Sequence, residues 1–93
     1  MNQSLFDVRP TDPATSHEAA DHAQKSKCRQ AVLDTLSALG PMNDDRLVRC
    51  LAMFPPGSVI KRRGELVRDG MVSDTGKRQN TQYGRLAIVW EAL

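Results

Sequence analysis

The chain has 93 residues, of which 40% are hydrophobic and 26% charged, and its formal net charge is +2. This length and composition are typical of one small globular domain with no low-complexity tract. The sequence contains no apolar run of the ~20 residues that a membrane helix needs, and residues 1–10 lack the basic start and apolar core of a signal peptide. We therefore expect a cytoplasmic protein without membrane insertion.

The positive charge is concentrated in the second part of the chain. Residues 1–56 carry six basic and seven acidic side chains, whereas residues 57–93 carry seven basic and four acidic ones. Such an asymmetry favours a nucleic-acid partner for the C-terminal part more than the small total charge suggests.

The N-terminal residues lack periodicity, and a helical pattern follows them. Residues 1–14 contain two prolines and are expected to form a flexible tail, so that the folded domain spans residues 15–93. Thr15 followed by Glu18 has the spacing of a capping box and predicts the first helix to begin there. Between residues 18 and 27 alanine is the only apolar residue type, so the role of segment 16–27 stays open.

A stronger helical signal continues this segment. Cys28, Val32, Leu36 and Leu39 recur at steps of four, four and three, which predicts one apolar helix face ending at Gly40-Pro41. Cys28 and Cys50 show no paired spacing, and we interpret both as free, buried thiols.

Two shorter helices are expected next. Asn43 is a suitable N-cap for a second helix, and its inner face is predicted to contain Leu47, Val48, Leu51 and Ala52. Ser58 is expected to cap a third helix that extends through Asp69 and stops at Gly70. Val59, Leu66 and Val67 can share the inward face of that helix.

The periodicity then changes to two, which is typical of strands. Residues 71–74 predict a short strand and residues 86–92 a second one, joined by a polar loop of residues 75–85 into an antiparallel hairpin. Tyr83 and Trp90 are expected to pack in the wing and the core, and residues around Met42 could add a short further strand. The order predicts an α+β fold: a winged helix-turn-helix with three helices and a C-terminal β-hairpin wing.

Particular motifs carry a family resemblance. "ELVRDGMV" (65–72) resembles the end of a winged-helix recognition helix, with Leu66, Gly70, Met71 and Val72 at the core, stop and strand-start positions. The series "DPATSHEAA", "VIKRRGELVRDGMVSDTGKR" and "GRLAIVW", within residues 12–90, resembles small winged-helix proteins common in actinobacteria and their bacteriophages. The resemblance implies a DNA-binding fold used in regulators and excision factors, which is also reused for protein binding.

A DNA-binding winged helix needs cations at the start of its recognition helix and on its wing, since these two places reach the major groove and the adjacent phosphates. The sequence therefore predicts double-stranded DNA as the partner, and the resemblance implies a small regulator of the phage or prophage type. The expected contacts are Ser58, Lys61, Arg62 and Arg68 from the helix, and Lys77, Arg78, Gln79 and Arg85 from the wing, with Asn80 beside them.

The same residues leave alternatives open. Arg63 falls on the seam of the third helix, either buried against a carboxylate or facing the ligand. Glu65, Asp69 and Asp74 temper the positive charge, so a module that binds and modulates a host protein is the alternative function. The oligomeric state also stays open, and a homodimer is one of its forms.

Other chemistry has little support in the sequence. His17 and His22 are five residues apart, which is not the i, i+4 spacing of paired metal ligands, and no cysteine or carboxylate cluster joins them. No glycine-rich phosphate loop is present, and Ser16, His17 and Glu18 are consecutive and cannot form a triad. We expect a protein that is not an enzyme and has no metal or cofactor.

Overall fold

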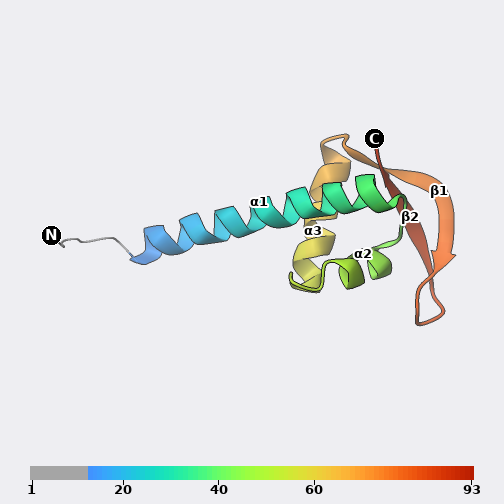
Figure 1. The fold of residues 1–93 in the computed structure, drawn as a ribbon, viewed down its shortest axis with the longest axis horizontal. Helices are drawn as coiled ribbons and strands as arrows, with labels where there is room; N and C mark the ends of the chain where they lie inside the picture. Colours follow the sequence, from blue (N-terminus) through green and yellow to red (C-terminus); the bar gives the residue numbers. More distant parts are fainter. Residues whose placement is uncertain (1–12) are drawn as a thin grey trace, which may run out of the picture.

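The computed structural model describes the backbone of residues 13–93 and the side chains of residues 21–93. Three helices, α1 (Pro13–Leu39), α2 (Asp44–Cys50) and α3 (Pro56–Arg68), precede two strands, β1 (Val72–Asn80) and β2 (Leu86–Ala92) (Figure 1). The expected tail lies almost wholly outside the described residues. The order of elements confirms the α+β, winged helix-turn-helix layout.

Helix α1 is the longest element, about 40 Å at 1.5 Å per residue. It begins at Pro13, so the prediction of Thr15 as its N-cap is wrong; proline suits a first helical turn because its missing N–H has no intrahelical partner there. Its C-terminal half packs on the domain, whereas its N-terminal half projects away from it, and every residue from 21 to 27 is exposed (Figure 1). Gly40, with φ of +91°, ends it as expected.

Helix α2 starts as its sequence predicts. The Asn43 side chain accepts a hydrogen bond of 2.9 Å from the backbone N–H of Arg46, and Leu47 is buried. Ala52, predicted on the inner face, is exposed because α2 ends at Cys50 and the chain turns there.

Helix α3 begins two residues earlier than expected. Pro55 is its N-cap and Pro56 its first residue, so Ser58 lies inside the first turn and does not cap it. At the other end, Gly70 has φ of +78°, and Met71 N–H donates to the Leu66 carbonyl at 2.9 Å. The bond from Met71 to Leu66 is the 6→1 bond of a Schellman motif, and it confirms Gly70 as the residue that stops α3.

The strands form an antiparallel hairpin, the wing. β2 matches the predicted range, but β1 continues through Gly76 to Asn80, well beyond the predicted residues 71–74. A bulge between Asp74 and Arg78 allows this continuation, because Gly76 adopts φ of +83° and the Thr75 hydroxyl donates to the Val89 carbonyl at 2.9 Å. Met42 pairs with Trp90 in an isolated bridge outside the two strands, so the short extra strand expected near Met42 is reduced to a single bridge.

The core lies where the three helices meet the base of the hairpin. Its buried members are Cys28, Val32, Leu36, Met42, Leu47, Leu51, Val59, Leu66, Val72 and Val89. Leu39 is exposed, although it was predicted on the apolar stripe, because α1 ends at that residue. None of the helices between residues 13 and 93 combines the length and apolarity needed to cross a membrane.

Candidate nucleic-acid interface

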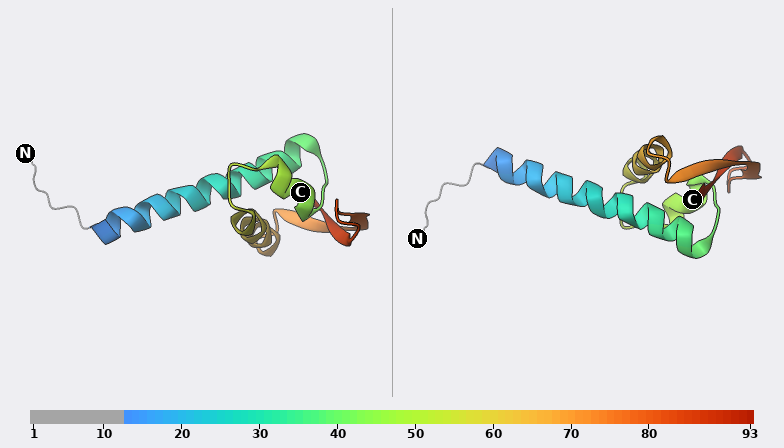
Figure 2. Two further views of the ribbon diagram at one scale, coloured as in Figure 1. Left: turned by 90° about the horizontal axis from the view of Figure 1, so that it is seen from below. Right: turned by 90° about the horizontal axis from the view of Figure 1, so that it is seen from above.

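Helix α3 and the wing lie on the same side of α1. Figure 2 shows this arrangement from two opposite directions, with α3 and the hairpin on one flank and α1 on the other. A ligand that lies against this flank can therefore touch both elements at once. This is the placement that a winged helix needs to reach a groove and its neighbouring phosphates together.

The outer face of α3 is defined by the residues it buries. Val59, Arg62 and Leu66 face inward, whereas Lys61 and Arg68, seven residues apart and so on one face, are exposed. Neither cation forms an ion pair with any residue between 21 and 93. Gly57 and Gly64 repeat at the same interval beside them, and Ile60, which is 42% exposed, lies between the two glycines in the sequence. This face therefore carries two cations that pair with no residue between 21 and 93, two glycines and one exposed apolar side chain.

The acidic residues of α3 are paired on the other side, toward α1. Glu65 contacts Arg62 at 3.0 Å and Arg29 at 3.6 Å, and Asp69 contacts Arg29 at 2.5 Å. The hydrogen bond to Asp69 is the main cause that raises the pKa of Arg29. Glu65 and Asp69 therefore form no ion pair with Lys61 or Arg68. The tempering that the sequence suggests falls instead on Arg62, through Glu65, and on Arg78, through Asp74.

Arg29 is the member of this arrangement that sequence reasoning missed as a site residue. It lies on α1, 40 residues before Asp69, and no local pattern connects the two. Only the packing of α1 against α3 brings Arg29 to Asp69, and the sequence does not show how these two helices pack.

The wing presents the second group of cations. Lys77, Arg78 and Gln79 are exposed on β1, beside Asn80, and Arg85 is exposed just before β2. Arg78 contacts Asp74 at 3.3 Å, four residues earlier and across the bulge. Lys77 and Arg85 form no ion pair within residues 21–93 and are therefore the free cations of the wing.

The tip of the wing is attached to α2. The backbone N–H and the side-chain amide of Gln82 each lie 3.3 Å from a carboxylate oxygen of Asp45. Arg49 contacts the same carboxylate at 3.1 Å. Tyr83 is 78% exposed at this tip, so the prediction that it packs against the wing is wrong: the turn directs it to solvent.

Two predicted contact residues do not lie on the outer face. Arg62 is only 6% exposed and faces α1, and its guanidinium pairs with Glu65 of the same helix, α3. Its predicted outward position is therefore wrong. Ser58 is half-buried and lines a cavity between α3 and α1. The cause is rotational phase: with Val59 and Leu66 in the core, positions 58 and 62 fall on the flank of α3 next to α1.

Arg63 has a structural role. Its guanidinium donates two hydrogen bonds to Asp44, of 2.9 and 2.6 Å, and lies 4.1 Å from the centroid of the Trp90 ring. It therefore connects α3 to the start of α2 and to β2, and it is not available to a ligand.

The two thiols differ. Cys28 is buried in the core, but Cys50 is exposed at the end of α2, so the expectation of two buried thiols is wrong for Cys50. Burial raises the pKa of Cys28, which keeps that thiol protonated. In the part of the chain with described side chains, no three His, Cys, Asp or Glu residues gather as metal ligands.

Comparison of the chain with known proteins found no relative. No protein-family model matches the sequence, and neither the curated proteins nor the solved structures gave a match.

Proposed function

We propose that this winged-helix protein binds double-stranded DNA through the outer face of α3 and the wing, as a small regulator of the phage or prophage type. The observation that supports the proposal best is the separation of charge across α3. Its acidic residues pair with Arg29 and Arg62 on the α1 side, whereas Lys61 and Arg68 are exposed and form no ion pair with any residue between 21 and 93. A flank with free cations on both elements suits a phosphate backbone.

The two elements have different chemical capacities. The outer face of α3 offers two cations and two glycines, which suit phosphates and a close backbone approach; among the bases its cations can bond the acceptors of guanine, and it has no carboxamide. The wing has the carboxamides Gln79 and Asn80, groups that can bond base edges in either groove. We therefore assign positioning to α3 and base selection to the wing.

The experiment that tests DNA binding is a salt titration of affinity for genomic fragments. Each phosphate contact contributes about −0.9 to the slope of log affinity against log salt. Replacing Lys61, Arg68, Lys77 and Arg85 together by Ala should therefore flatten the slope by about three to four and weaken binding steeply. The matched control replaces Lys25 and Lys27, two exposed cations on the projecting half of α1, and should leave the slope unchanged.

The assignment of base selection has a separate test. Gln79→Ala with Asn80→Ala should alter the ranking of DNA sequences and leave the salt slope unchanged, whereas Lys61→Ala should weaken all sequences alike. Selection from a randomised DNA pool measures both effects. A wild-type protein that shows no salt-sensitive binding to any fragment would overturn the DNA proposal.

A module that binds a host protein remains the second candidate, and one observation favours it. The exposed residues 21–27 belong to a helix segment that projects from the domain (Figure 1), and such a segment is available to a partner. Capture of one stoichiometric host protein after nuclease treatment, lost when residues 1–24 are removed, would support this candidate over DNA.

A further inference from the structure

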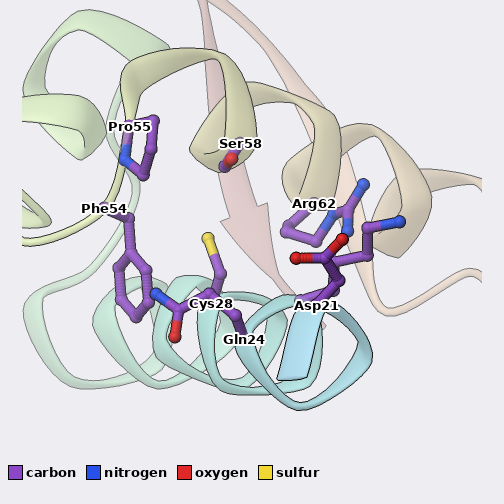
Figure 3. A pocket seen from close by; sticks show the side chains of 8 residues that line it. Asp21, Gln24, Cys28, Phe54, Pro55, Ser58 and Arg62 are labelled. Atoms are coloured by element: carbon purple, nitrogen blue, oxygen red, sulfur yellow. The ribbon is translucent and has the colours of Figure 1, made fainter. Parts of the chain in front are cut away.

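A cavity of about 250 Å³ opens where the projecting half of α1 leaves the domain, between α1 and the beginning of α3 (Figure 3). Its lining residues are Asp21, Gln24, Lys25, Cys28, Phe54, Pro55, Ser58 and Arg62. In Figure 3, Phe54 and Pro55 lie on one side of this space and Arg62 and Asp21 on the other, with Cys28 and Gln24 between them. The cavity therefore has an apolar wall facing a charged one.

Arg62 is an unusual residue for such a wall. The residue is only 6% exposed, and a buried guanidinium is costly unless its donors find acceptors. Glu65 accepts from one end of it, at 3.0 Å from Nη2, but the buried Nε has no hydrogen-bond partner among the residues with described side chains. The hydrogen-bonding capacity of Arg62 is therefore not fully used within residues 21–93, although the Nε atom itself has less than 1 Å² of accessible surface.

We propose that the cavity is a binding site for a small organic carboxylate with an apolar body. Arg62 lines the cavity and its Nη2 is already paired with Glu65, so a carboxylate in the cavity would form a single charge-assisted hydrogen bond with the guanidinium. Lys25 lines the same cavity and adds a second cation, and the Ser58 hydroxyl adds a donor. Phe54, Pro55 and the protonated Cys28 thiol form the wall against which the apolar body packs.

The size of the cavity limits the ligand. It is smaller than the roughly 300–1,000 Å³ of sites for drug-sized molecules, so the ligand has the size of an amino acid or a simple aromatic acid. Asp21 lines the cavity as well, and its charge opposes an anion. Removing the charge of Asp21 should therefore strengthen the binding of an anion, whereas removing the charge of Lys25 should weaken it.

The probe for the test is benzoate, with benzamide as its neutral counterpart of the same shape. Binding is followed by the chemical shift of the Arg62 Nε–H resonance and by backbone amide shifts, in the absence of nucleic acid. We expect benzoate to bind in the millimolar range and to move the Arg62 Nε–H resonance, and benzamide to bind at least about tenfold more weakly, because a charge-assisted hydrogen bond is lost.

Four variants give a pattern that a nonspecific effect does not reproduce. Arg62→Gln should abolish benzoate binding, with circular dichroism to confirm that the variant is folded. Lys25→Gln should weaken binding about threefold and Asp21→Asn should strengthen it about threefold, the size expected for partly exposed charges. Lys27→Gln removes the same charge from the same helix outside the cavity and should leave binding unchanged.

Lys25 and Asp21 are exposed, so their variants keep the proposal testable even if Arg62→Gln does not fold. Equal binding of benzoate and benzamide, no binding of either, or an unchanged affinity in both Lys25→Gln and Asp21→Asn would overturn it. Because no DNA is present, this outcome is distinct from that of the proposed DNA binding.

Discussion

Arg63 has more partners in different elements than its neighbours on α3. Its side chain is 15% exposed and that of its partner Asp44 24% exposed, so water screens the pair only in part. The Trp90 ring lies on the face of the same guanidinium. One side chain thus ties together the start of α2, the middle of α3 and the end of β2.

Removing this side chain should therefore lower the stability of the whole domain. We expect Arg63→Ala to lower the free energy of unfolding by about 2 kcal/mol, since it breaks a partly buried bidentate pair and a cation–π contact. Urea unfolding followed by Trp90 fluorescence measures this change. Arg49→Ala is the control: Arg49 is 54% exposed and its partner Asp45 keeps its hydrogen bonds from Gln82, so the loss should be at most about 0.5 kcal/mol. Equal losses in both variants would contradict the role given to Arg63.

The two thiols should differ in reactivity. Cys50 is exposed, whereas burial raises the pKa of Cys28, so a thiol reagent at neutral pH should modify one cysteine quickly and the other only on unfolding. Cys50→Ser should remove the fast phase of the modification.

The folded state holds the Cys28 proton more tightly than the unfolded chain does. The Cys28 thiol therefore stabilises the fold below the ordinary thiol pKa, and that contribution is lost as pH rises above this value.

Within α3 and its termination, two glycines have opposite roles. A methyl group added at either position would meet no atom within 4 Å, so backbone conformation alone decides the outcome. Gly64 lies in the helix interior and costs helical stability relative to alanine. Gly70 has φ of +78°, a region that residues with a Cβ rarely adopt.

Alanine substitutions should therefore change stability in opposite directions. We expect Gly64→Ala to raise the free energy of unfolding by about 0.5–1 kcal/mol and Gly70→Ala to lower it by about 1–2 kcal/mol. Thermal unfolding measures both. If DNA approaches the outer face of α3 closely, Gly64→Ala should weaken DNA binding even as it stabilises the fold. A variant that gains both stability and DNA affinity would contradict a close approach of DNA at this face.

The elements differ in how far the sequence predicts them. Asn43, Gly70 and the bounds of β2 follow local rules, so the structure confirms them. Arg62 depends on which flank of α3 the first helix covers, and the Arg63–Asp44 and Arg29–Asp69 pairs join residues 19 and 40 positions apart. β1 was predicted too short because a glycine that normally marks a turn instead forms a bulge.

At the scale of the whole molecule, the length of α1 divides the chain into a packed domain and a projecting helix. From residue 21 to 27 the side chains of this helix are exposed, so the segment adds little buried surface. We expect that removing residues 1–20 changes the free energy of unfolding by less than about 0.5 kcal/mol. Chemical denaturation of the full chain and the shortened one measures the difference, and a large loss would show that the segment packs on the domain.

The same helix should also have two distinct opening regimes. Amides between Cys28 and Leu39 lie on the packed half, so they should exchange their hydrogens with solvent only through global unfolding. Amides before Asp21 can open by fraying from the free end, because an unpacked helix of this length is marginal in water. A plot of exchange rate against residue number along α1 should therefore fall steeply between residues 20 and 28, within one uninterrupted helix.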